Sequence, residues 1–286
     1  MSPDGPRRDT RGIVDAAELM THVRFRRREP APELRPYLEH YWLIDWDLAE
    51  PYASHVVPHP CVNVVFQRYE SADGGGDEES FGEVAGIGLE LFTKKLTGRG
   101  RVCGVQFRPG GFRPFAPAWP VSRWTGRRVP LDEVFADAGR SAASMVAAVL
   151  DPATDDARVA ALDAFLLAHG PAPDVRAEQA MALVDLARRD RTVRRVSELA
   201  AAGGLSARSL QRLFATRVGV GPKWVILRYR IHEALERAES GDGPDTLDWA
   251  RLAADLGYSD QAHLVRDFTA TVGVPPTAYA RQVSDP

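Results

Sequence analysis

The chain has 286 residues, of which 44% are hydrophobic and 26% charged, a balance typical of soluble globular domains and not of a disordered chain. No apolar run approaches the roughly 20 residues that span a bilayer, and the segment from Met1 to Arg11 lacks the apolar core of a secretory signal, so we expect a cytoplasmic protein with no membrane partner. Two cysteines are too few for a disulfide framework or a four-thiolate zinc site.

The net charge of −3 hides a strongly basic segment. Residues 188–230 contain 11 basic and two acidic residues, a net charge of +9, whereas residues 231–286 have a net charge of −6. A compact basic segment in an acidic protein is typical of a surface that binds a polyanion. A solvated helical face has the same composition, so charge alone leaves both interpretations open.

In chain order, residues 1–20 are predicted to be a disordered tail, and residues 21–172 a sensory or dimerisation domain. Between Arg24 and Phe107, apolar runs punctuated by Gly and Pro predict a small β-barrel or cupin-like antiparallel sheet. Helices are predicted over residues 131–150 and 158–169. Pro171 to Pro173 is a stiff break at the domain boundary. The expected strands cover residues 37–46, 56–66, 81–91 and 101–107.

Residues 175–283 are predicted to be almost wholly helical and contain an internal repeat, so the fold class is α+β with a second, all-α domain. The segment Val196–Pro222 aligns with Trp249–Pro276. Positions up to Ser206 match at an offset of 53, and positions from Leu210 onward match at an offset of 54. The second copy therefore has one extra residue just after Ser259.

Each copy is predicted to be a helix, a tight turn and a second helix. Gly204 and Gly257 stand where the first helix ends in a left-handed residue, and Ser206 and Ser259 stand where a side-chain oxygen can cap the next helix. This is the pattern of a helix-turn-helix, whose second helix enters the major groove of DNA. The apolar stripe of the second helix is Leu210, Leu213, Phe214 and Val218 in the first copy, and Leu264, Phe268 and Val272 in the second.

A helix from Lys223 to Ser240, opened by Pro222, is predicted to join the two copies. Its apolar side would be Trp224, Leu227, Ile231, Leu235 and Ala238. Such a helix is about 27 Å long, close to the roughly 34 Å that separate successive major grooves on one face of DNA.

These residues resemble a known family. The segments LSARSLQRLF, VGVGPKWVILRYRI, LAADLGYSDQAHLVRDF and VGVPPTAY closely resemble the DNA-binding domain of AraC/XylS-family transcriptional regulators over Val193–Arg281. Upstream, His59–Phe66 and Gly104–Phe112 more loosely resemble the sensory domains of some members. The resemblance implies a regulator that binds double-stranded DNA and is not an enzyme. A small-molecule effector, RNA polymerase and a second copy of the chain are further partners that it suggests.

The resemblance also assigns DNA contacts, which agree with the outward faces of the predicted helices. Arg reads guanine and Gln reads adenine in the major groove. Base-reading residues would be Arg208, Gln211, Arg212, Gln261, His263 and Arg266. Phosphate contacts would come from Arg191, Arg194, Arg195, Arg217, Lys223 and Arg228. The alternative for Arg212 and Arg266 is a phosphate contact, and for His263 simple exposure to solvent.

Other constellations are weighed against simpler interpretations. His55, His59 and Cys61 would share one face of a strand and so offer metal ligands, but Pro58 and Pro60 interrupt that strand. We therefore expect a buried thiol with two unrelated histidines, no metal, no cofactor and no catalytic residue. Cys103 is expected in the core.

Aromatic residues of the N-terminal half suggest either an apolar ligand pocket or a filled core. They are Tyr41, Trp42, Trp46, Phe66, Phe107, Phe112, Phe115, Trp119 and Trp124. The alternative functions are a DNA-repair or modification enzyme with a similar DNA-binding half, and an adaptor that binds no DNA.

Overall fold

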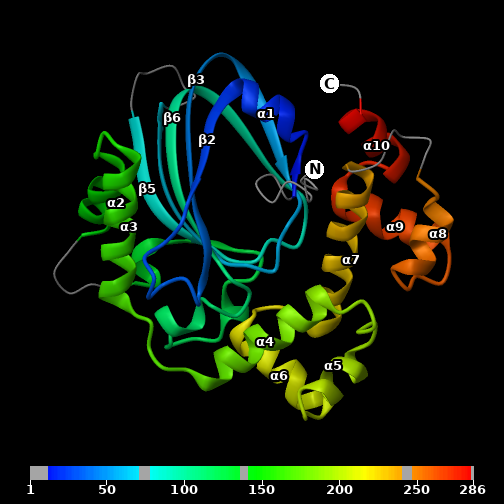
Figure 1. Cartoon of the computed structure of the whole chain (residues 1–286). Coiled ribbons are helices and arrows are strands. Elements are labelled where there is room, and N and C mark those ends of the chain that lie inside the picture. The colour runs from blue at the N-terminus through cyan, green and yellow to red at the C-terminus, as the bar shows by residue number, and fades with distance from the viewer. Residues whose placement is uncertain (1–11, 71–77, 136–140, 240–246, 285–286) are drawn as a thin grey trace, which may run out of the picture.

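The computed structural model describes residues 12–70, 78–135, 141–239 and 247–284. It has an N-terminal sheet domain with two helices on one face and a C-terminal helical domain, as the sequence predicts (Figure 1). Within the described residues, no helix combines the length and the apolar character that a bilayer span requires.

The sheet domain contains seven antiparallel strands in the order β1-β3-β6-β4-β5-β7, with β2 beside β3. Helices α2 and α3 pack against one face of the sheet, and α1 connects β1 to β2 along the chain. The strands are β1 (Ile13–Val14), β2 (Val23–Arg28), β3 (Leu38–Val56), β4 (Asn63–Glu70), β5 (Glu78–Ala85), β6 (Phe92–Phe107) and β7 (Arg128–Pro130). The helices are α1 (Ala16–His22), α2 (Ala142–Leu150) and α3 (Asp155–His169).

Four expectations for this domain were wrong in whole or in part. The sheet is open and not a closed barrel, because its edge strands β1 and β7 have two and three residues and the described pairings do not join them. Residues 12–20 are not a tail, since they form β1 and most of α1; residues 1–11 lie outside the described residues. Pro58 and Pro60 delay the second expected strand, so that β4 begins at Asn63. Part of the helix expected over residues 131–150 falls on residues 136–140, which are not described, and α2 begins at Ala142.

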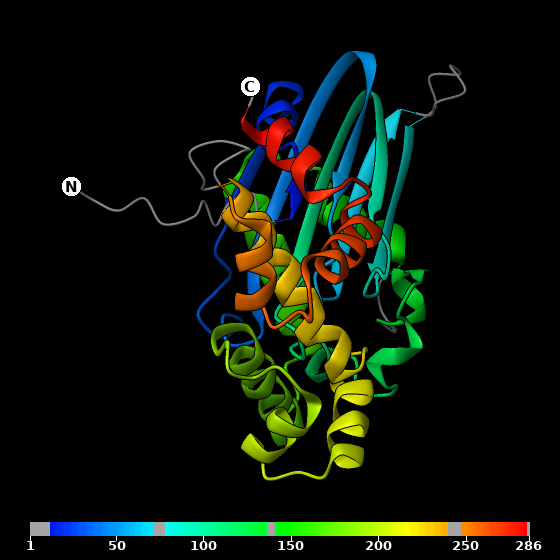
Figure 2. The same ribbon diagram turned by 90° about the vertical axis from the view of Figure 1, so that its right-hand side faces the viewer.

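The C-terminal domain consists of seven helices within the described residues. They are α4 (Val175–Arg189), α5 (Val196–Ala202), α6 (Ala207–Arg217), α7 (Pro222–Glu239), α8 (Trp249–Asp255), α9 (Gln261–Val272) and α10 (Pro276–Ser284). Figure 2 shows α7 running between the bundle of α4 to α6 and the bundle of α8 to α10, with the sheet behind it.

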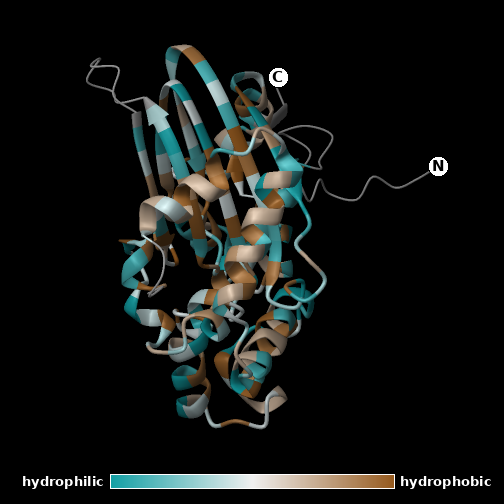
Figure 3. Ribbon diagram, turned by 90° about the vertical axis from the view of Figure 1, so that its left-hand side faces the viewer, coloured by the Kyte–Doolittle hydropathy of each residue, from teal (hydrophilic) through white to brown (hydrophobic). Residues whose placement is uncertain are grey.

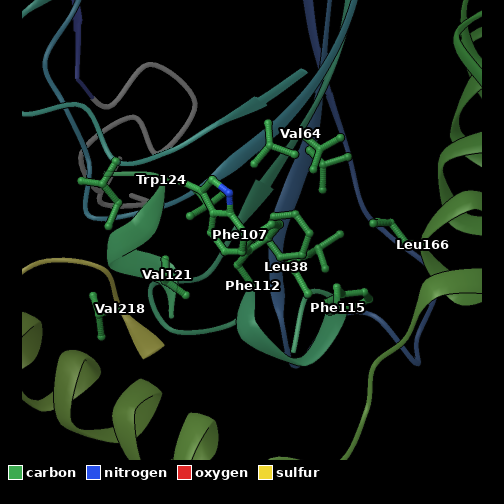
Figure 4. Close-up of a cluster of buried hydrophobic side chains, with 14 of the residues drawn as sticks. Leu38, Val64, Phe107, Phe112, Phe115, Val121, Trp124, Leu166 and Val218 are labelled. Carbon is green, nitrogen blue, oxygen red and sulfur yellow. The ribbon is translucent and has the colours of Figure 1, made fainter. Parts of the chain in front are cut away.

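The aromatic residues of the sheet domain mostly form a filled core and not a pocket. Rings of Phe107, Phe112 and Trp124 meet edge to face at centroid distances of 5.1 to 5.5 Å (Figure 4). Fully or almost fully buried members are Tyr41, Phe66, Phe107, Phe112, Phe115 and Trp124. Trp119 is 49% exposed, and Trp42 and Trp46 lie on the opposite face of the sheet.

Trp42 and Trp46 of β3 lie opposite glycines of β6. The register pairs Trp42 with Gly104 and Trp46 with Gly100. A Cβ atom on either glycine would lie 2.0 Å from the indole ring of its partner. Each indole therefore occupies the space that a side chain on β6 would take, which explains two glycines inside a long central strand.

We predict that Gly100→Ala lowers the free energy of unfolding by about 1–3 kcal/mol, because the added methyl group overpacks the strand against Trp46. Denaturant unfolding followed by tryptophan fluorescence measures this change. Gly88→Ala is the matched control, since its Cβ would meet no atom closer than 3.8 Å. Equal stability of the Gly100→Ala and Gly88→Ala variants would contradict the packing argument.

Candidate nucleic-acid interface

The first repeat folds as the sequence predicts. Gly204, which follows α5, has a left-handed φ of 62°, and the Oγ of Ser206 accepts a hydrogen bond from the backbone N of Ser209 at 3.1 Å. Leu210, Leu213 and Phe214 of α6 are buried. These constraints fix which face of α6 is left in solvent.

The three residues expected to read bases from α6 all lie on that outward face. Arg208, Gln211 and Arg212 are exposed. The other side of the end of α6 is covered by the sheet domain, because Gly219, just after α6, lies against Val121 and Ile87. The sheet domain therefore supports α6 from behind and leaves its polar face free.

The second repeat differs from the prediction at its helix cap. Gly257 has a left-handed φ of 75°, as expected. The capping residue of α9 is Asp260 and not Ser259: Oδ1 of Asp260 accepts from the backbone N of His263 at 2.8 Å. Asp260 is the extra residue of the second copy, so the insertion supplies the cap and moves Ser259 one position away from it.

The outward face of α9 is only partly free. Gln261 and Arg266 are exposed. The ring of His263 contacts the ring of Tyr258 at a centroid distance of 5.1 Å, and its Nε2 lies 3.7 Å from Asp267. Asp267 thus faces His263, and His263 has protein partners that it would share with any base.

The residues expected to contact phosphates differ in whether they already have a partner within the protein. Arg194, Arg195 and Lys223 are exposed and form no ion pair within the described residues. Arg191 is exposed but pairs with Glu233 at 2.7 Å. Arg217 is half-buried and its Nε lies 3.3 Å from Asp174 on the cap of α4. This ion pair draws Arg217 away from a phosphate role.

Arg228 was assigned wrongly. It is 6% exposed, its Nη2 donates to the carbonyl of Leu89 at 3.3 Å, and its guanidinium lies 4.5 Å from the ring centre of Trp224. Desolvation lowers the pKa of Arg228 to about 10. Arg228 therefore joins α7 to the sheet domain and does not reach DNA in this arrangement.

Sequence reasoning missed a set of polar contacts that joins the two repeats directly. Arg230 of α7 donates to the carbonyl of Arg194 at 2.8 Å, and Arg194 packs against Gly257, whose Cβ would lie 2.8 Å from Arg194 Cδ. Glu233 accepts from Arg237, which also contacts Asp255. The inter-repeat contacts, meaning Arg191, Arg194, Arg230, Glu233, Arg237 and Asp255, hold the start of α5 against the turn between α8 and α9. A periodic pattern in the sequence cannot indicate such a contact, because the contact links residues far apart in the chain.

Residues 199–282 match the family model of a helix-turn-helix domain. This region is similar to the helix-turn-helix domains of AraC-type regulators. Residues 26–130 match the model of a domain of unknown function, DUF6597. No curated protein matches the chain.

Several solved structures are similar to the chain. An AraC-type transcriptional regulator from Chromobacterium violaceum is 19% identical, with 38% of this chain and 95% of that chain covered and a TM-score of 0.35. ToxT from Vibrio cholerae is 11% identical, with 84% and 97% covered and a TM-score of 0.41. ToxT with a bound unsaturated fatty acid is 13% identical, with 88% and 96% covered and a TM-score of 0.40. At these low scores, function has to be argued from the residues of this chain.

The two cysteines of the sheet domain are buried, and the two histidines nearest to Cys61 in sequence contact other side chains. Cys61 and Cys103 are buried, and desolvation raises the pKa of each thiol to about 12, so neither is a thiolate at neutral pH. His55 pairs with Thr93, whereas His59 stacks on His232. Across the described residues, no group of three or more His, Cys, Asp or Glu is placed to hold a metal ion.

We predict that Asp260→Ala destabilises the second repeat more than Ser259→Ala does, because Asp260 accepts the capping hydrogen bond. That bond from the backbone of His263 holds the pKa of Asp260 below its ordinary value. The stabilisation is therefore present above the ordinary pKa of an aspartate and is lost as the pH falls through the folded value. Thermal unfolding of both variants at neutral and acidic pH measures this. A larger loss for Ser259→Ala would restore Ser259 as the cap.

Proposed function

We propose that the protein is a sequence-specific DNA-binding transcription regulator in which α6 and α9 read base edges in the major groove. One observation carries the proposal: both repeats turn the polar face of their second helix to solvent while the opposite face is buried. A helical adaptor would not require Arg and Gln on the same outward face of both copies.

The length and position of α7 support a model in which the two repeats bind the same face of the DNA. The helix has 18 residues, so its axis is about 27 Å long. Its two ends carry the two repeats (Figure 2). We propose that α6 and α9 enter successive major grooves, about 34 Å apart, without wrapping the duplex.

The assigned contacts follow from exposure and charge. We propose that Arg208, Gln211 and Arg212 read one half of the site. Gln261, His263 and Arg266 would read the other half. Arg195 and Lys223, with Arg194, would contact phosphates beside the first repeat. Since the first repeat lies in the basic segment and the second in the acidic one, the first would supply most of the electrostatic affinity and the second chiefly selectivity.

We also propose that the sheet domain, predicted as residues 21–172 but already ordered from β1 onward, is a sensory domain, and that residues 175–283 are the DNA-binding domain. The two domains are in contact just after α6 and along α7: Oγ1 of Thr125 donates to the carbonyl of Gly219 at 2.7 Å, and Nε2 of His232 lies 3.1 Å from the carbonyl of Pro58. A small-molecule effector would act by favouring one arrangement of the two domains. Contacts with RNA polymerase and with a second copy remain predictions of the family resemblance.

Selection of bound duplexes from a random DNA library by the full-length protein tests the proposal. We expect an enriched site with two recognised segments about one helical turn apart, 10–10.5 base pairs between centres. Enrichment of no sequence over the starting library, at low salt, would overturn the reading of α6 and α9 as base-reading helices.

We predict that Arg212→Ala costs about 1–3 kcal/mol of binding free energy on the selected site and relaxes the preference at one or two base pairs. Fluorescence anisotropy against the selected site and its single-base variants measures both effects. Arg176→Ala is the matched control, because Arg176 is an exposed arginine on α4 that bonds to Gln179. An equal loss on every sequence would make Arg212 a phosphate contact.

We predict that Lys223→Gln and Arg195→Gln each reduce the slope of log Kd against log salt by about 0.9, the value expected for one phosphate contact. Arg217→Gln should leave the slope unchanged, because Asp174 already neutralises that guanidinium. Salt titrations of the three variants decide the matter. A slope that falls only for Arg217→Gln would reverse the assignment.

A further inference from the structure

A charged groove lies on the sheet domain, away from the base-reading helices. The strands extend beyond α2 and α3, and their uncovered ends carry hydrophilic residues as well as hydrophobic ones (Figure 3). The groove has a volume of about 790 Å³ and is bordered by the end of α1 and by strands β2, β3, β4 and β6. Figure 1 places α1 at the opposite end of the molecule from α6.

The strand register builds a charged row across this groove. Arg24 of β2 pairs with Asp45 of β3, Asp45 pairs with Arg101 of β6, and Arg101 pairs with Arg68 of β4. Partners that lie directly opposite in neighbouring strands point to the same face. Asp47 and Arg99, also directly opposite each other, form the next charged pair.

Cations exceed anions in this groove. Its lining contains the arginines 24, 68, 99 and 101 but only the carboxylates Asp45 and Asp47. Arg68 and Arg101 are like charges directly opposite each other, an arrangement that destabilises a sheet unless an anion lies between or beside them. Asp151 at the end of α2 contacts Arg68 at 2.6 Å and offsets part of this repulsion.

Asp45 holds the guanidinium group of Arg101 in a fixed position. Asp45 accepts from Nε of Arg101 at 2.7 Å and from Arg26, while Nη1 of Arg101 donates to the carbonyl of Leu150 at 2.9 Å. Burial alone would raise the pKa of Asp45, but the hydrogen bonds from Arg101 and Arg26 outweigh it and the pKa lies below its ordinary value. Asp45 therefore stays ionised and holds Arg101 in place, with Nη2 of Arg101 not used by any described bond.

The outer arginines are exposed, although Nη2 of Arg99 donates to Oδ2 of Asp47 at 3.1 Å. The side chains of Arg24 and Arg99 are 73% and 70% exposed. Arg24 lies 3.9 Å from Asp155, a distance at the limit of an ion pair. Guanidinium groups bind carboxylate and phosphate oxygens in pairs, so two of them on opposite sides of a groove favour a ligand with two anionic groups.

We propose that this groove binds a small molecule that carries at least two anionic groups, carboxylate or phosphate. The proposal goes beyond DNA reading and does not depend on it. It also differs from the apolar ligand pocket that was one of two interpretations of the aromatic residues, most of which form a filled core.

Isothermal titration calorimetry of the full-length chain, without DNA, tests the proposal with pyrophosphate and citrate as probes. We expect saturable binding with one site per chain for at least one probe, and weaker binding of orthophosphate. The better of the two probes distinguishes a phosphorylated ligand from a polycarboxylate. The absence of saturable binding of both probes up to millimolar concentrations would overturn the proposal.

The variant Arg24→Gln/Arg99→Gln locates the site. Both side chains are exposed, so the variant is expected to fold, which thermal unfolding without ligand verifies. We expect at least a tenfold increase in Kd. Arg35→Gln is the matched control, because Arg35 is an exposed arginine paired with Glu29 outside the groove, and it should bind as the unaltered chain does. Equal affinity of the double variant and the control would place the anion elsewhere and overturn the assignment.

Discussion

Helix α7 is packed on several sides at once, and the arrangement of the rest of the molecule depends on this packing. Its first half contributes Val225 and Ile226 to the core that also contains the sheet and the first repeat. Its second half contributes Ile231 and Leu235 to the core of the second repeat, which includes Val57 from the sheet domain. Because one continuous helix belongs to both cores, the two repeats cannot separate without exposing apolar surface.

The contact between α7 and the sheet domain is partly polar. Arg228 and His232 are both buried there, and the ring of His232 stacks on that of His59 at a centroid distance of 3.8 Å. Burial of charged and polar groups offsets part of the stabilisation that apolar contact provides. Such a contact opens at a lower free energy than an apolar one of the same size. This is consistent with our proposal that an effector shifts the arrangement of the two domains while the cores of the repeats stay closed.

Local rules predicted the repeats well because their determinants are local. Gly204 and Gly257 adopt left-handed conformations, and Ser206 caps α6, since each feature depends on a few neighbouring residues. Asp260 escaped prediction because the inserted residue and the serine that matches Ser206 are both capable of capping the helix. Arg228 escaped it for another reason. The helical pattern of α7 indicated a single apolar face, but α7 is covered from two directions, so Arg228 is buried and Leu227 is only half-buried.

The sequence was sufficient to predict which faces of α6 and α9 are exposed. It was not sufficient to predict which cations of the basic segment are left without an ion pair. Several cations of the basic segment have partners within the molecule: Arg188 with Asp185, Arg191 with Glu233 and Arg217 with Asp174. Arg228 is buried, and burial lowers the pKa of Arg230. The exposed cations of this segment that form no ion pair within the described residues are Arg194, Arg195, Arg208, Arg212 and Lys223. Arg194 and Arg195 directly precede α5, Arg208 and Arg212 are on α6, and Lys223 is at the start of α7. The net charge of +9 therefore overstates the field that DNA would meet, but the cations that remain are concentrated where the proposed contacts need them.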